Sequence, residues 1–152
     1  MPADVRGADP ERYGVLMITI TIPGEMRGKG RPRFTSRGGF AKAYTDDKTK
    51  NAEAWVKHCA VTQAGSVPTD AAVSVAVAVE VVPPASWSKT KRASAIAGGF
   101  YPTSKPDLDN VVKLIADALN GIVWQDDKQI VRMVASKRYG PVAQAVLTVA
   151  EA

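Results

Sequence analysis

Residues 105–129 read KPDLDNVVKLIADALNGIVWQDDKQ, and this segment has the most regular helical pattern in the chain. Six of its apolar residues recur at helical spacing: Val111, Leu114, Ile115, Ala118, Leu119 and Ile122. Such a stripe predicts a helix over about residues 109–120 that packs one face on a core. Asp109 is expected to be the N-cap of this helix, and Asn120 followed by Gly121 its C-terminal stop.

Patterns on both sides of this helix predict an α+β fold. Alternating apolar residues predict four strands, at residues 16–22, 72–82, 129–138 and 143–149. An earlier helix is expected to end at Gly65, and a short helix is expected within residues 86–98. The expected order is strand, helix, strand, short helix, helix, strand, strand. These elements fit two layers, with one mixed β-sheet and helices packed on one face.

The bulk composition is that of a single globular domain. The 152 residues are 45% hydrophobic and 23% charged, and no apolar run reaches the roughly 20 residues that cross a bilayer. We expect a loosely ordered lead-in over residues 1–14 and one domain over residues 15–152. Cys59 is the single cysteine and is expected in the core rather than as a nucleophile. A chain without disulfides or an apolar signal segment favours a cytoplasmic location.

Positive charge is concentrated in two runs that contain no acid, within a net charge of +5. The first run contains Arg27, Lys29, Arg31, Arg33, Arg37 and Lys42. The second run contains Lys89, Lys91, Arg92 and Lys105. Each run alone is compatible with an ordinary solvated loop. Two such runs in a short chain favour a surface that binds a phosphate backbone.

Acidic residues gather at both ends of the helix predicted from residue 109. Asp107 and Asp109 stand two apart, and in an extended lead-in such side chains point to the same side. Lys113 follows Asp109 by one helical turn. After the helix the chain reverses, and Asp126 and Asp127 can return toward the first two acids.

Three carboxylates brought together repel one another, and a divalent cation removes that repulsion. Oxygen ligands without His or Cys suit Mg²⁺, with Mn²⁺ as a substitute. Such an ion activates water and stabilises charge on a phosphodiester, with Lys113 close enough to assist. The alternative is that Asp109 only caps the helix, Asp107 is merely exposed, and Asp126 and Asp127 are turn residues. Spacing alone leaves these two interpretations open.

The same residues resemble a known family, the RusA Holliday junction resolvases. The motif DLDN, the lysine three residues after its Asn, the DAL helix end and W-x-D-D-x-Q appear in the family's order within residues 107–129. Upstream, GKGRPRFTSRGG at residues 28–39 is similar to the basic stretch of the longer, phage-type members. The resemblance covers roughly residues 18–149. The loop over residues 86–106 is longer than in the short members of the family.

The resemblance implies a Mg²⁺-dependent homodimer that nicks two strands symmetrically across a four-way junction or other branched DNA. Its setting would be DNA recombination and repair in the cytoplasm of a bacterial cell or phage-infected host. By position, Asp107, Asp109 and Asp127 would be catalytic metal ligands, and Lys113 the catalytic lysine. Asp126 and Asn110 would be supporting residues.

Two functional hypotheses therefore stand. The first is a structure-specific endodeoxyribonuclease that uses these acids. The second is a non-catalytic, basic nucleic-acid-binding module whose acids are structural. An enzyme acting on a small phosphate compound is disfavoured, because the chain has neither a P-loop nor a dinucleotide-binding motif.

Overall fold

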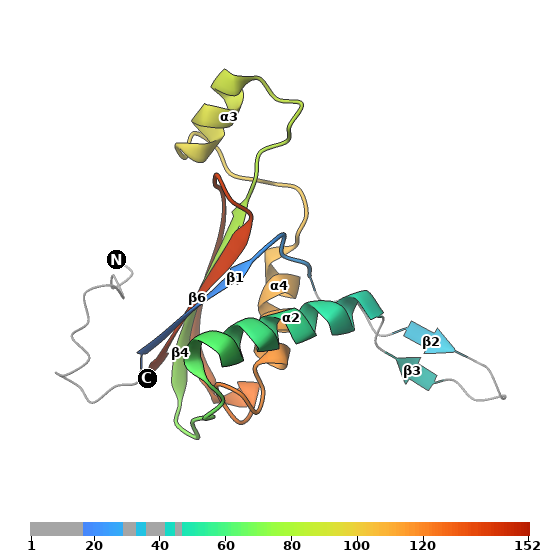
Figure 1. Ribbon diagram of the computed structural model, residues 1–152, viewed down its shortest axis with the longest axis vertical. Helices are drawn as coiled ribbons and strands as arrows, with labels where there is room; N and C mark the ends of the chain where they lie inside the picture. Colours follow the sequence, from blue (N-terminus) through green and yellow to red (C-terminus); the bar gives the residue numbers. More distant parts are fainter. Residues whose placement is uncertain (1–16, 29–32, 36–41, 45–46) are drawn as a thin grey trace.

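A computed structural model describes residues 17–28, 33–35, 42–44 and 47–152, and every structural statement below concerns these residues. In this described part, helices pack on a mixed sheet of four strands, and a small two-stranded hairpin projects to one side (Figure 1). The predicted α+β class and order of the main elements are confirmed. The strands are β1 (Met17–Pro23), β2 (Arg33–Thr35), β3 (Lys42–Tyr44), β4 (Val73–Val81), β5 (Ile130–Tyr139) and β6 (Gln144–Glu151). The helices are α2 (Asp47–Ala64), α3 (Lys89–Ile96), α4 (Leu108–Ala118) and the 3₁₀ turn η3 (Asp127–Gln129).

The large sheet has the strand order β1-β6-β4-β5. β6 runs antiparallel to both β1 and β4, whereas β4 and β5 are parallel and are joined through α3 and α4. Helix α2 covers the β1 edge, where the side chain of Gln63 pairs with the backbone of Thr21: its amide donates to the carbonyl (2.6 Å) and its oxygen accepts from the N–H (2.8 Å). β5 forms the other edge of this sheet.

The core lies between the sheet and the pair α2 and α4. Val73, Val75, Val77 and Val79 of β4 are buried, as are the alternate residues of β6 that face the same way. Five residues of the predicted apolar stripe, Val111, Leu114, Ile115, Ala118 and Leu119, are buried against them, and Ile122 packs at the margin. Cys59 is buried too, as expected from its apolar position in α2. The sequence pattern therefore predicts which face of β4 and of α4 packs inward.

Helix α3 stands beyond one end of the sheet, above the layer formed by α2 and α4 (Figure 1). The rings of Trp87, Phe100 and Tyr139 pack together there, with centroids 5.5–5.8 Å apart. Because Tyr139 is the last residue of β5, this aromatic cluster attaches α3 to the end of the sheet.

The predicted lead-in over residues 1–14 lies outside the described residues. None of the described helices combines the length and the hydropathy that a membrane span requires.

Candidate active site

The first turn of α4 presents three polar side chains to solvent. Asp107, Asp109 and Asn110 are all exposed, and the Asn110 side-chain amide donates to Asp107 Oδ2 over 3.4 Å. Asp107 is the N-cap, in extended backbone conformation, and its carbonyl accepts from the Val111 N–H. The expectation that Asp109 caps the helix is therefore wrong, since Asp109 lies inside the first turn. Asp109 still stabilises the helix there, because a negative charge in the first turn interacts favourably with the positive end of the helix dipole.

This boundary changes the geometry of the two acids. Asp107 and Asp109 do not share an extended segment, because the helix already begins at Leu108. Side chains two apart on a helix do not face one another. The geometric reason given for their convergence is thus wrong, although both carboxylates remain at the exposed helix start. Leu108 packs against the core, as expected.

A second group of charges lies at the other end of α4. Lys113 Nζ is 3.5 Å from Asp117 Oδ1, one turn further along the helix. Asp127, at the start of η3, contacts the carboxylate of Asp117. Burial raises the pKa of Asp127, and its hydrogen bonds and repulsion with Asp117 raise it further, while Lys113 acts in the opposite direction. Two acids and one lysine therefore meet where α4 faces η3.

The turn that carries Asp127 is tightly held by its neighbours. Asp126 is the N-cap of η3, and its Oδ1 accepts from the Lys128 N–H (3.0 Å). That backbone hydrogen bond lowers the pKa of Asp126. Gln129 Oε1 accepts from the N–H groups of Gln125 and Asp126, and its amide donates to the carbonyls of Thr69 and Ala71. Asp126 and Gln129 thus fix the backbone on both sides of Asp127.

The structure does not gather the three predicted ligands into one cluster. Within the described residues, no three His, Cys, Asp or Glu side chains lie together as a metal site. Asp127 reaches α4 at Asp117, eight residues after Asp109, which is roughly 12 Å along a helix. The donors nevertheless suit a hard cation, because all are carboxylate oxygens and Asp117 and Asp127 repel one another.

The raised pKa of Asp127 predicts how its removal affects stability without metal. The fold favours the protonated acid, so stability is lost as pH rises from the ordinary Asp pKa through the raised one. Asp127→Asn removes this repulsion and is expected to raise the melting temperature by about 1–2 °C near pH 7 in EDTA. Thermal unfolding should show this gain shrinking as pH falls below about 4. A variant destabilised equally at both pH values would contradict the pKa shift.

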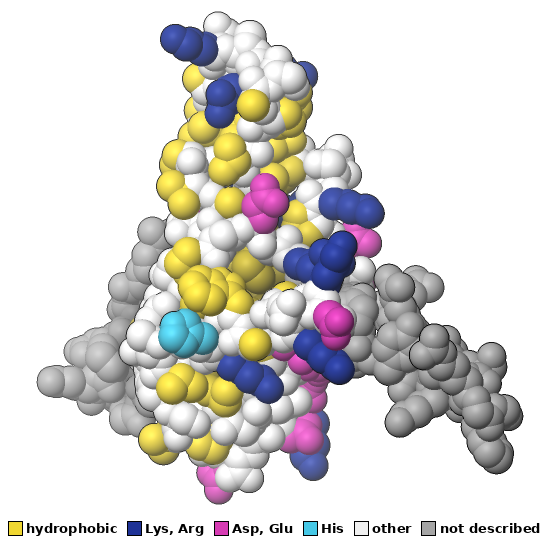
Figure 2. All heavy atoms as spheres, turned by 45° about the vertical axis from the view of Figure 1, so that its right-hand side comes forward, with side chains coloured by type: hydrophobic (Ala, Val, Ile, Leu, Met, Phe, Trp, Pro, Cys, Tyr) yellow, Lys and Arg dark blue, Asp and Glu magenta, His cyan; other side chains and the backbone are white. Residues whose placement is uncertain are grey.

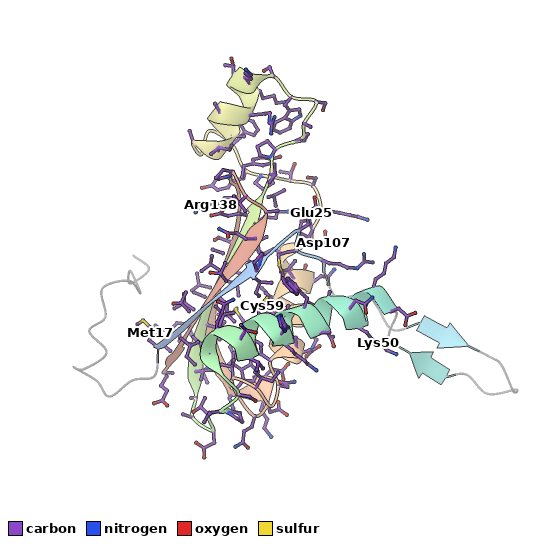
Figure 3. The ribbon with its side chains drawn as sticks, viewed as in Figure 1. Met17, Glu25, Lys50, Cys59, Asp107 and Arg138 are labelled. Carbon is purple, nitrogen blue, oxygen red and sulfur yellow. The ribbon has the colours of Figure 1, made fainter. Side chains whose placement is uncertain are left out.

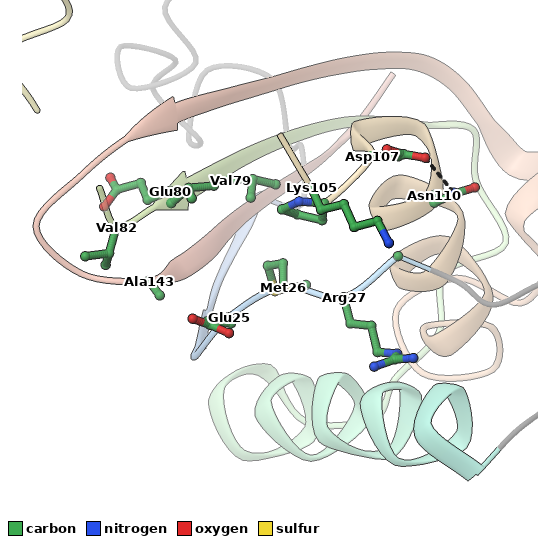
Figure 4. Close-up of a pocket in the computed structure, with 13 residues that line it drawn as sticks. Glu25, Met26, Arg27, Val79, Glu80, Val82, Lys105, Asp107, Asn110 and Ala143 are labelled. Atoms are coloured by element: carbon green, nitrogen blue, oxygen red, sulfur yellow. Dashed lines mark hydrogen bonds between the residues drawn. The ribbon is translucent and has the colours of Figure 1, made fainter. Parts of the chain in front are cut away.

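A cavity of about 660 Å³ opens beside the first turn of α4. Asp107 and Asn110 line it from the helix, and Lys105 lines it from the segment before the helix. Arg27, after β1, lies on the opposite side, and the Lys105 side chain extends toward that segment (Figure 4). Two basic residues, Lys105 and Arg27, therefore line the same cavity as Asp107. Glu25, which is labelled with Asp107 in Figure 3, lines it too.

Gly28 explains how the segment after β1 approaches α4 so closely. A Cβ atom on Gly28 would lie 2.7 Å from the Cβ of Asn110, closer than real Cβ contacts. Only glycine lets this backbone rest on the first helical turn, so Gly28 positions Arg27 relative to Asp107.

The predicted DNA-binding residues lie in separate parts of the molecule. Lys89 and Lys91 are exposed on α3, and Arg92 is half-buried there. Lys91 Nζ lies 4.0 Å from the centroid of the Trp87 ring. Figure 2 shows basic side chains at the α3 end, and further basic and acidic side chains mixed along one edge of the visible face. Lys29, Arg31 and Arg37 lie outside the described residues, and of Arg33 only its position in β2 is described.

Three residues that appear in the quoted motifs, but to which the sequence assigned no role, shape this site. Asp117 connects Lys113 to Asp127, Gln129 holds the turn, and Gly28 seats the basic segment. The i, i+4 spacing of Lys113 and Asp117 is a signal for the first. The contacts of Gln129 and Gly28 join residues roughly 60 and 80 positions apart, and no local pattern indicates them.

Carboxylates next to basic segments define a site suited to a phosphate-containing polymer. The model of the family "Endodeoxyribonuclease RusA" matches residues 23–150. An "Uncharacterized protein YqaN" from Bacillus subtilis (strain 168) is 36% identical over 124 residues, which cover 80% of this chain and 87% of YqaN. The chain belongs to the RusA family of endodeoxyribonucleases. The family resemblance expected from the sequence is thereby confirmed, and the class of activity it indicates is hydrolysis of DNA phosphodiester bonds.

Proposed function

We propose that this protein is a divalent-metal-dependent endonuclease that resolves four-way DNA junctions by paired, symmetric nicks. One observation carries the proposal: Asp107 lines a cavity whose walls also carry Arg27 and Lys105, in a member of the RusA family. A DNA phosphate entering this cavity would meet two positive charges beside exposed carboxylates.

Asp107, Asp109 and Asp127 are the residues that would hold Mg²⁺, or Mn²⁺ in its place. When bound, the cation supplies Lewis acidity and an activated water. Lys113 would stabilise negative charge that develops on the phosphate, from its exposed position between the two groups of acids. Asp126 and Asn110 would support Asp127 and Asp107, with which they already interact.

A homodimer is part of this proposal, because a nearly two-fold junction is matched by a two-fold protein. The valine-rich strand β4 is poorly placed for the dimer contact, because it lies between two other strands and four of its five valines are buried. Edge strand β5 is the better candidate, since Val131, Met133 and Val134 are 63%, 36% and 51% exposed. Sedimentation analysis would give the oligomeric state.

The decisive experiment incubates the protein with a synthetic four-way junction, a linear duplex and a single strand, with Mg²⁺ or with EDTA. Paired nicks near the junction centre that disappear in EDTA support the endonuclease. Binding without any cutting supports the non-catalytic module instead. Mapping the products to the nucleotide identifies the cleavage position.

Junction affinity is expected to fall steeply with salt. Lys and Arg side chains that contact phosphates release counterions, so four or more contacts would weaken binding about 100-fold between about 50 and 200 mM salt. A binding titration at several salt concentrations measures the slope. Neutralising Lys105, which borders the cavity, should lower that slope by about one unit. Salt-independent binding would exclude the basic runs as the DNA surface.

A further inference from the structure

The segment that leads into α4 is held by a lysine on a neighbouring strand. Lys137 of β5 donates from Nζ to the Ser104 carbonyl over 2.7 Å and to the Pro106 carbonyl over 3.0 Å. These two carbonyls flank Lys105 and immediately precede Asp107. The Lys137 side chain thus holds the backbone next to two residues that line the cavity, Lys105 and the proposed metal ligand Asp107.

Lys137 occupies an unusual position for a charged residue. In the β4–β5 register it is opposite Val79, whose side chain is buried in the core, and Lys137 is half-buried. A lysine on the inward side of a strand is disfavoured unless its ammonium group finds acceptors. The two backbone carbonyls are those acceptors, and hydrogen bonds from a charged donor are stronger than neutral ones.

The segment itself has few other polar anchors. Within the described part of the chain, no backbone-to-backbone hydrogen bond involves residues 100–106. After the bond from the Gly99 N–H to the Ser94 carbonyl, the next such bond along the chain joins the Val111 N–H to the Asp107 carbonyl and belongs to α4. Lys137 therefore supplies hydrogen bonds that this stretch does not obtain from other backbone groups.

We propose that Lys137 is a positioning residue for DNA cleavage, which acts by holding residues 104–106 so that Asp107 and Lys105 face the same cavity. This inference rests on the proposed function of that cavity. It assigns Lys137 no contact with DNA, because its ammonium group is engaged by the protein itself.

The test compares Lys137→Met, which keeps the aliphatic stem, with Lys137→Arg, which keeps a charged donor. Lys57→Met is the matched control, because it removes one positive charge from an exposed position on α2, outside the cavity lining and strand β5. In EDTA, amide hydrogen exchange of a peptide covering residues 99–112 should be faster in Lys137→Met and unchanged in Lys57→Met. This arm reads the anchoring of the segment without any cleavage.

With Mg²⁺ and a four-way junction, Lys137→Met should cut about 10–100-fold more slowly, the loss typical of residues that orient metal ligands. It should also need more Mg²⁺ for half-maximal rate, while junction affinity in EDTA stays close to that of the unaltered protein. Lys137→Arg should recover most of the protection and most of the rate.

The assignment would be overturned if Lys137→Met cut at the rate of the unaltered protein, if its hydrogen exchange were unchanged, or if Lys57→Met showed an equal defect. If the Met variant does not fold, Lys137→Arg decides: weak cleavage together with full protection would overturn the assignment as well. If the unaltered protein cuts no DNA, the proposed function fails, while the exchange experiment still tests the anchoring.

Discussion

Replacing Asp107, Asp109 or Asp127 with asparagine is expected to slow junction cleavage by about 100-fold or more, while junction binding persists. Asparagine keeps the size of aspartate but lacks the negative charge that a divalent cation requires. Removing a group that only orients a metal ligand lowers metal affinity or activity roughly 10–100-fold, so removing a ligand itself should lower the cleavage rate at least as much. Binding should survive, because it depends on Lys and Arg contacts to phosphates.

Asp47→Asn is the matched control for these variants. Asp47 is an exposed acid in the first turn of α2, as Asp109 is in the first turn of α4. It should cut at the rate of the unaltered protein. Single-turnover cleavage with saturating protein separates the chemical step from binding, and gel-shift titration in EDTA measures the affinity.

Different outcomes among the three variants would be informative. Asp107 and Asp109 lie at the start of α4, whereas Asp127 contacts Asp117 near its end. If only the first two variants lose cleavage, Asp127 acts with Asp117 and Lys113 as a structural group. If all three cut at the unaltered rate, the site assignment is wrong.

The sequence predicted the elements well because their signals are local. The apolar stripe of α4 recurs every three or four residues, and β4 alternates valine with small residues. Each pattern records one face that packs on the core, and no distant contact is needed to interpret it. The candidate site residues also lie within one continuous segment, where a local motif can be recognised, but their roles stay a prediction.

The start of α4 shows where local signals fail. Asp107 and Asp109 are both acceptable near a helix N-terminus, one as a cap and the other in the first turn. The backbone before Asp107 is held by a distant residue, since Lys137 donates to the carbonyls of Ser104 and Pro106. That contact spans roughly 30 residues, so the sequence pattern around Asp107 cannot reveal it.

The partner of Asp127 could not be predicted for a similar reason. Asp109 and Asp117 lie two helical turns apart on one face of α4, and either could meet an acid that returns after the helix. The turn after α4 decides between them: Trp124 is buried there and Gln129 ties η3 to residues 69–71. These contacts place the Asp127 side chain next to Asp117.

Trp124→Ala is expected to cause the largest loss of stability in this part of the molecule. Trp124 has no exposed surface, and its indole N–H donates to Asn120 Oδ1 over 3.0 Å. Its backbone carbonyl also accepts from the Gly121 N–H over 2.7 Å, which closes the turn after α4. Removing a buried Trp side chain typically costs about 3–5 kcal/mol. Domains are stable by only about 5–15 kcal/mol, so the melting temperature should fall by about 10 °C.

Two further variants isolate the cause of this loss. Trp55→Ala removes a tryptophan that is 45% exposed, with an indole N–H that donates to the Pro23 carbonyl, and it should cost far less. Trp124→Phe keeps most of the buried ring but loses the N–H, and it should cost only about 1 kcal/mol because exposed Asn120 can turn to water. Denaturant unfolding of the three variants measures the order. If Trp55→Ala lowered the free energy of unfolding as much as Trp124→Ala, burial would not explain the contribution of Trp124 to the stability of this turn.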